Sequence, residues 1–184
     1  MLPSTATPAH AHDVIGVGGF YGGLLHPLLV PAHIMALVAL GLLMGQQAPD
    51  RHALLALLTA ALVAGIVVIV LAFAADNPDY AVLAVAALAG IAVAAGRPLP
   101  VALTGPIVLV AGVAVALDSV PQEISMPATF LALVATAIMA VIVTALAAAI
   151  ATRLARGWPA IAVRVAGSWI AASAILVLAL RLTR

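Results

Sequence analysis

The chain has 184 residues, of which 66% are hydrophobic and only 7% are charged. Soluble globular chains carry about 25% charged residues, so this composition excludes an ordinary water-soluble domain and predicts an integral membrane protein. The net charge of +1 gives no indication of nucleic-acid binding, and the lack of cysteine excludes disulfides and thiolate metal ligands.

The first 13 residues, MLPSTATPAHAHD, are polar. They contain no basic stretch followed by an apolar run, so we do not expect a secretory signal peptide. We expect residues 1–13 to form a tail outside the membrane. His10, His12 and Asp13 in this tail make a His-x-His-Asp run, which is a candidate for capturing a metal ion. The alternative is a solvated tail that binds nothing.

Six apolar segments follow the tail, and each approaches or exceeds the length of about 20 residues that a transmembrane helix needs. Backbone groups in lipid must be hydrogen-bonded internally, and the segments show no alternation of apolar and polar residues, so we expect helices and not barrel strands. Proline and glycine mark the short connections. The sequence therefore predicts an all-α six-helix bundle, a single transmembrane domain over residues 14–184. The expected segments are 14–45, 51–75, 78–95, 99–117, 127–152 and 159–180.

The first segment is too long for one straight span and contains Pro27 and Pro31. Each proline lacks an N–H and clashes with the carbonyl four residues back, so the carbonyls of Gly23 and Pro27 lose their helical partners. We expect two half-helices, from about Val14 to Leu25 and from Pro31 to Gly45. The glycines of GVGGFYGG favour tight packing against neighbouring helices, with self-association at a subunit interface as the alternative.

Charged residues predict the orientation in the membrane, because positive residues favour the cytoplasmic side. The first, third and fifth connections, with the start of the last helix, carry Arg51, Arg97, Arg153, Arg156 and Arg164. Acidic residues gather in the tail and in the second and fourth connections, where Asp118 is expected to be a loop charge. Both termini are therefore expected outside, although Arg181 and Arg184 contradict this pattern.

The stretch GGFYGGLLHPLLVPAHIMALVALGLL resembles the HupE/UreJ family of hydrogenase and urease accessory membrane proteins. Its motif, His-Pro-x-x-Gly-x-Asp-His, matches at His26, Pro27 and His33. The resemblance implies a six-helix protein of the bacterial inner (cytoplasmic) membrane that admits nickel and in some cases cobalt.

The chain also departs from the family pattern. Val30 and Ala32 replace the glycine and the aspartate of the motif, and no histidine follows His52, so the second histidine motif of the family is missing. The motif aspartate would offset the positive N-terminal end of the second half-helix, which Ala32 cannot do. What remains is an incomplete metal motif.

His26 and His33 are the candidate metal ligands. Nickel and cobalt favour imidazole and carboxylate ligands, and a buried histidine is neutral and keeps a lone pair. A spacing of seven residues puts the two rings about 10 Å apart on a regular helix, so one ion needs the helix break to reach both. The alternative is that both histidines only hydrogen-bond the freed carbonyls or a neighbouring helix.

No catalytic constellation is evident, so we do not expect an enzyme. The resemblance implies a passive permease for Ni²⁺ or Co²⁺, with His26, His33 and the Gly23 carbonyl at its constriction. The alternative is a structural subunit of a larger membrane complex that has lost metal transport. The lipid bilayer is the expected surrounding, with other membrane subunits as further partners. The helix hydroxyls can bond their own helix backbones, and we do not expect them to form a transport pathway; they include Thr59, Thr104, Thr136, Thr144 and Ser168.

Overall fold

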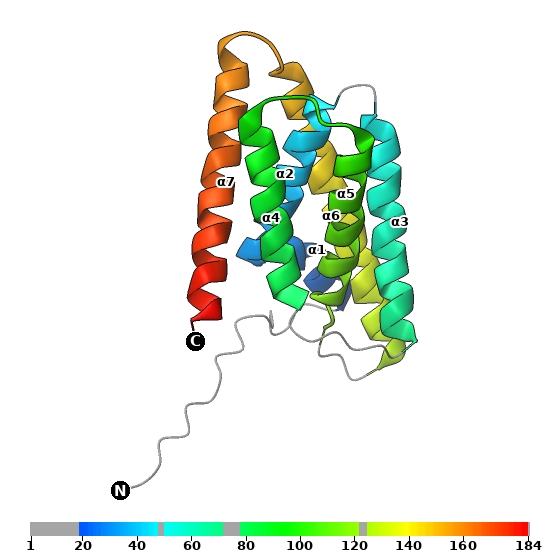
Figure 1. Cartoon of the computed structure of the whole chain (residues 1–184). Helices are drawn as coiled ribbons and strands as arrows, with labels where there is room; N and C mark the ends of the chain where they lie inside the picture. Colours follow the sequence, from blue (N-terminus) through cyan, green and yellow to red (C-terminus); the bar gives the residue numbers. More distant parts are fainter. Residues whose placement is uncertain (1–18, 48–49, 72–77, 122–124, 184) are drawn as a thin grey trace, which may run out of the picture.

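The structure, a computed structural model, describes residues 19–47, 50–71, 78–121 and 125–183. These residues form seven helices and no strand (Figure 1). Since the first two helices share the first apolar segment, each of the six predicted segments is largely helical where it is described, while residues 14–18 and 72–75 of the first two segments lie outside the described residues. In chain order the helices are α1 (Gly19–Leu29), α2 (Pro31–Gln46), α3 (Arg51–Val70), α4 (Pro78–Ala95), α5 (Val101–Leu117), α6 (Met126–Arg153) and α7 (Trp158–Leu182).

Local sequence explains where these helices begin. Proline occupies one of the first two positions of α2, α6 and α7, where its missing N–H costs nothing. Ser125 precedes α6 and accepts a hydrogen bond from the backbone N–H of Ala128. Gly157 precedes α7 with a φ of 67°, a left-handed conformation that glycine adopts without strain.

Helix length and polarity identify a multi-pass membrane protein. The four helices α3, α4, α6 and α7 are long and apolar enough to cross a membrane. The pair α1 and α2 passes the same test as one broken span, and α5 is an apolar helix of 17 residues. The described chain therefore matches the predicted six-segment membrane bundle.

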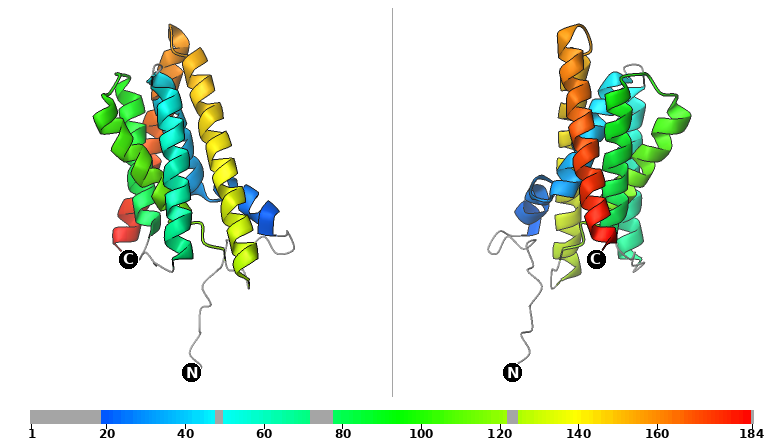
Figure 2. Two further views of the ribbon diagram at one scale, coloured as in Figure 1. Left: turned by 90° about the vertical axis from the view of Figure 1, so that its right-hand side faces the viewer. Right: turned by 60° about the vertical axis from the view of Figure 1, so that its left-hand side comes forward.

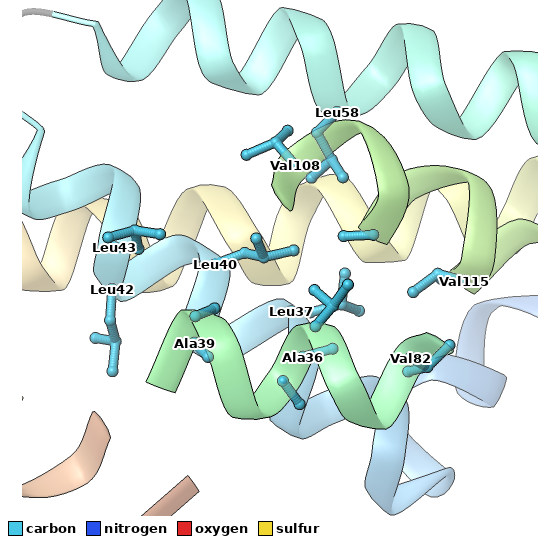
Figure 3. Packing of buried hydrophobic residues seen from close by; sticks show 14 of the residues in the cluster. Ala36, Leu37, Ala39, Leu40, Leu42, Leu43, Leu58, Val82, Val108 and Val115 are labelled. Carbon is cyan, nitrogen blue, oxygen red and sulfur yellow. The ribbon is translucent and has the colours of Figure 1, made fainter. Parts of the chain in front are cut away.

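The second helix is the centre of the bundle (Figures 1 and 3). It packs most extensively against α6 and α4. Leu37 and Leu40 on α2 are fully buried, and they lie among Leu58 of α3, Val82 of α4 and Val108 of α5 (Figure 3). A helix that is apolar on all sides is expected at such a core position.

The outer faces of the bundle are apolar as well. Large hydrophobic side chains such as Val63 on α3, Leu146 on α6 and Trp169 on α7 are more than half exposed. A soluble monomer rarely exposes so many large apolar side chains, whereas lipid tails solvate them. This exposure agrees with the assignment to the membrane.

Small residues allow the long helices to approach closely. The most extensive helix pair is α4 with α7. A Cβ on Gly90 of α4 would lie 2.8 Å from the backbone nitrogen of Ala171 and from the carbonyl oxygen of Gly167, both on α7. Close approach of this kind is the usual basis of helix association in lipid.

Charged residues divide the bundle into two ends (Figure 1). The upper end in that view, here called the arginine-rich end, holds the turns that follow α4 and α6 and the start of α3. It carries Arg51, Arg97, Arg153, Arg156 and Arg164.

Arg181 lies at the opposite end and forms an ion pair with Asp79. The pair joins the last turn of α7 to the first turn of α4. Arg181, which contradicts the predicted orientation, thus has a nearby acidic partner in Asp79.

Candidate functional site

The candidate site lies at the elbow between α1 and α2, where the helix direction bends by 71°. Val30 at the elbow is extended, with φ −88° and ψ 111°, and Pro31 begins α2. The helical conformation is disfavoured for a residue that precedes proline, and proline itself is well suited to a first helical position. The predicted broken helix and the role of Pro31 agree with this geometry. Figure 2 shows α1 turning away from the bundle axis to lie against α6.

The break lies at Val30 and not near His26, so α1 runs four residues beyond the expected end at Leu25. His26 and Pro27 are both inside the helix. The helical bonding continues past Pro27, since the backbone N–H of Val30 still bonds the carbonyl of His26 at 3.1 Å. The carbonyl of Gly23, which Pro27 leaves without an intrahelical donor, also finds a partner elsewhere.

That partner is Thr136 of α6, whose hydroxyl donates to the Gly23 carbonyl at 2.9 Å. Gly23 is buried directly against α6, and a Cβ there would overlap the carbonyl oxygen of Ala132. Thr136 can also bond its own helix backbone, but it bonds the freed carbonyl, which is a better acceptor than one already in a helical bond. The Gly23 carbonyl is therefore engaged within the bundle.

His33 is the third residue of α2 and is fully buried. Its Nε2 lies 2.8 Å from Oδ2 of Asp118, whose side chain is 19% exposed. Asp118 directly follows α5 and caps its C-terminus. The carboxylate thus lies close to the N-terminal turn of α2, where negative charge is favourable.

Asp118 is the functional candidate that the sequence pattern missed. It was expected to be a loop charge, yet it supplies a carboxylate to His33 from 85 residues away. Ala32 cannot supply this charge, and Asp118 supplies it from another helix. One signal was available: a carboxylate at a helix C-terminus opposes the helix dipole, so it is expected there only with another partner.

His26 lies beside His33. The two ring centroids are 5.0 Å apart, with an angle of 66° between the ring planes. On a regular helix they would be about twice as far apart, so the elbow is what brings the two histidines together. A buried polar atom also remains at this place, since Nδ1 of His33 has no hydrogen-bond partner among the described residues.

The remaining candidate ligands are His52 and the three residues of the N-terminal tail. His10, His12 and Asp13 lie outside the described residues. His52 is near the arginine-rich end, where it accepts a hydrogen bond from Arg51 at 3.2 Å. In the described part of the chain, no group of three or more His, Cys, Asp or Glu side chains is arranged to hold a metal ion. The arrangement therefore offers two imidazoles and one carboxylate that orients one of them.

Comparisons with known proteins give one result. No curated protein and no solved structure matched the chain in the two searches. A family model described as HupE / UreJ protein matches residues 1–177, nearly the whole length. The chain therefore belongs to the HupE/UreJ family.

Proposed function

We propose that this protein is a permease for a divalent transition metal ion, Ni²⁺ or Co²⁺, with its selective constriction at the elbow between α1 and α2. His26 and His33 are the ligands in this proposal, and Asp118 is a positioning residue. The observation that carries it is the 2.8 Å contact between His33 Nε2 and Asp118. Membership of a family of accessory membrane proteins associated with these metals supports the choice of cargo.

The chemistry of that contact prepares His33 for a metal. An ionised carboxylate only accepts hydrogen bonds, so Nε2 of His33 must carry the proton. In the neutral ring the other nitrogen, Nδ1, then keeps its lone pair, and it has no partner among the described residues. Metal-binding histidines commonly donate their second ring nitrogen to a carboxylate in this way.

The small number of ligands suits a passage site better than a storage site. Two imidazoles leave most coordination positions of an ion to water, so the ion binds weakly and leaves quickly. Conduction needs binding that is favourable enough for entry and weak enough for release. The engagement of the Gly23 carbonyl by Thr136 removes that carbonyl from the proposed ligands.

We propose the bacterial inner membrane as the location, with the arginine-rich end toward the cytoplasm and the N-terminus outside. Five arginines gather at that end, in agreement with the preference of positive residues for the cytoplasmic side. The proposed metal site then lies nearer the outer face, since the elbow is toward the other end of the bundle (Figures 1 and 2).

Metal accumulation in cells tests the permease proposal. A bacterial strain without its own high-affinity nickel uptake would express the wild type, His33→Ala, His26→Ala or His52→Ala, and cellular Ni and Co would be measured by mass spectrometry. We expect wild-type cells to gain metal, both elbow variants to lose the gain, and His52→Ala to behave as wild type. His52 is the matched control because it is a histidine near the opposite end of the bundle.

Two results would contradict the proposal. One is wild-type cells that accumulate no more metal than cells with an empty vector. The other is unchanged accumulation in His33→Ala when immunoblotting shows equal amounts of protein in the membrane. The first removes the permease function, and the second removes only the assigned site.

A structural subunit of a larger membrane complex is the second candidate function. It is favoured by the same contact, since a hydrogen bond between His33 and Asp118 also serves simply to tie α2 to α5. Purification in a mild detergent separates the two functions. A subunit brings other chains with it in a fixed ratio, whereas a permease that acts alone purifies as a single species.

A further inference from the structure

A cavity of about 150 Å³ lies at the arginine-rich end, far from the elbow. Its walls come from the end of α2, from the turn after α4 and from both sides of the turn between α6 and α7. The volume is well above the ~10–15 Å³ of such space that one water molecule needs. Residues that line it include Gln46, Gly96, Arg97, Ala155, Ala160 and Arg164.

Two guanidinium groups give this cavity its charge. Arg97 and Arg164 both line it, and no acidic side chain from the described part of the chain does. Within the described ranges, the ion pairs are His33 with Asp118 and Arg181 with Asp79, so neither cavity arginine has a carboxylate partner there. Uncompensated guanidinium groups at one concave place attract an anion, and their planar forks suit phosphate oxygens.

The position of Arg164 depends on the backbone around it. Its Nε donates to the carbonyl of Ala94 at 3.0 Å, near the end of α4, where a cation is favourable. The side chain passes over Gly96, whose φ is 63° and where a Cβ would lie 2.7 Å from that Nε. Gly96 therefore allows the left-handed turn and also leaves room for the Arg164 side chain. The guanidinium group is held at the cavity wall as a result.

Gln46 adds a polar group of the opposite kind. Its side-chain nitrogen donates to the carbonyl of Val93 at 3.1 Å, while its Oε1 is buried without a partner among the described residues. A buried acceptor of this kind is stabilised by a donor such as a hydroxyl. The cavity therefore presents donors for an anion and one acceptor for a hydroxyl.

We propose that this cavity binds the headgroup of an anionic phospholipid, with the phosphate between Arg97 and Arg164 and a headgroup hydroxyl on Gln46. The surroundings favour a lipid over a soluble anion, because Trp158 and Ile161 beside the cavity on α7 are 79% and 55% exposed. An acyl chain can lie on that apolar face while the headgroup enters. Basic pockets between transmembrane helices are known places for such headgroups.

Thermal unfolding of the purified chain tests the proposal. The protein in a neutral detergent would be titrated with dioleoylphosphatidylglycerol, with dioleoylphosphatidylcholine, or with inorganic phosphate. We expect the Tm to rise with phosphatidylglycerol only. The Arg97→Gln/Arg164→Gln variant should need at least roughly tenfold more of this lipid for the same rise in Tm, because each arginine near an anionic headgroup contributes to the binding free energy.

Matched controls separate a built site from general attraction. Arg153→Gln/Arg156→Gln removes the same charge at the same end, but neither arginine lines the cavity, so it should respond as wild type. If Arg164→Gln fails to fold, Arg97→Gln and Ala160→Leu replace it, since the second fills the cavity without changing charge. Both should weaken the response.

Three results would overturn the proposal. The first is the absence of any shift with phosphatidylglycerol. The second is an equal loss of response in the two double variants, which means that only net charge matters. The third is stabilisation by inorganic phosphate alone to the same extent, which makes a soluble anion the occupant. All three are independent of metal transport.

Discussion

The elbow of α1 and α2 and the interface of α4 with α7 solve the same packing problem by different means. Both place a glycine directly against the backbone of another helix: Gly23 of α1 packs against α6, and Gly90 of α4 packs against α7. At α4 and α7 the helices are continuous, and the ion pair there lies at the end of the bundle. At the elbow the helix is broken, and two polar contacts lie within the bundle: the buried contact of Thr136 with Gly23 and the partly buried contact of His33 with Asp118.

The difference follows from the backbone. A continuous helix satisfies its own amides and carbonyls, so its neighbours need only fit its shape. A broken helix frees polar groups that lipid cannot satisfy, so other helices must bring hydroxyl or carboxylate groups to it. Polar side chains therefore gather where the helix breaks, and that gathering is what creates a place suited to an ion.

The largest expected effect concerns glycine, which both regions share. Gly23→Ala and Gly90→Ala each place a Cβ against backbone atoms of another helix, and we expect a loss of about 3 kcal/mol in the free energy of unfolding. Gly105→Ala is the control, because its Cβ would meet only Leu57 at 3.8 Å. Denaturant titration in mixed micelles, followed by circular dichroism, measures the three variants. Equal stability of all three would mean that the two interfaces are looser than described.

The next effect separates the two regions. Asp118→Ala leaves the buried N–H of His33 without its acceptor, and we expect a loss of about 2 kcal/mol by the same titration. Asp118→Asn keeps an acceptor oxygen and should lose about half as much. A loss in Asp118→Ala no greater than that in Asp118→Asn would show that the hydrogen bond does not stabilise the elbow.

Thr136→Val tests the freed carbonyl. The change keeps the shape of the side chain but removes the hydroxyl that bonds Gly23, and we expect a loss of about 1 kcal/mol. Thr59→Val is the control, because the hydroxyl of Thr59 bonds only the carbonyl of Leu55 on its own helix. Equal stability of the two variants would show that the hydrogen bond to the Gly23 carbonyl does not stabilise the elbow.

The smallest effect belongs to the ion pair between α4 and α7. Arg181→Gln should reduce the free energy of unfolding by only about 0.5 kcal/mol, since Arg181 is 45% exposed and solvent screens the pair. A double-mutant cycle with Asp79→Asn measures the coupling between the two residues directly. A coupling as large as the effect of Asp118→Ala would remove the distinction between an end contact and a buried one.

Much of this fold was predictable because its causes are local. Apolar runs give the spans, and Pro31 gives the start of α2. The end of α1 was placed four residues too early because the sequence pattern does not show that Pro27 is tolerated inside a helix. That tolerance depends on Thr136, which is 113 residues from Gly23.

The candidate site was half predictable for the same reason. His26 and His33 stand out as polar residues in an apolar stretch, and the prolines beside them indicate a break. Asp118 does not stand out, since an acidic residue after a helix is ordinary in a loop. Only the packing of α5 beside α2 brings its carboxylate to His33.

The central claim is that Asp118 fixes the proton of His33 on Nε2 and leaves Nδ1 for a metal. Solid-state ¹⁵N nuclear magnetic resonance of histidine-labelled protein in lipid bilayers reads the protonation of each ring nitrogen. The signals that disappear in His33→Ala are those of the His33 ring. Diamagnetic Zn²⁺ is added as a probe of metal binding. We predict a neutral ring with the proton on Nε2, and an Nδ1 signal that shifts when Zn²⁺ is added. A proton on Nδ1, or an Nδ1 signal that Zn²⁺ leaves unchanged, would contradict the claim.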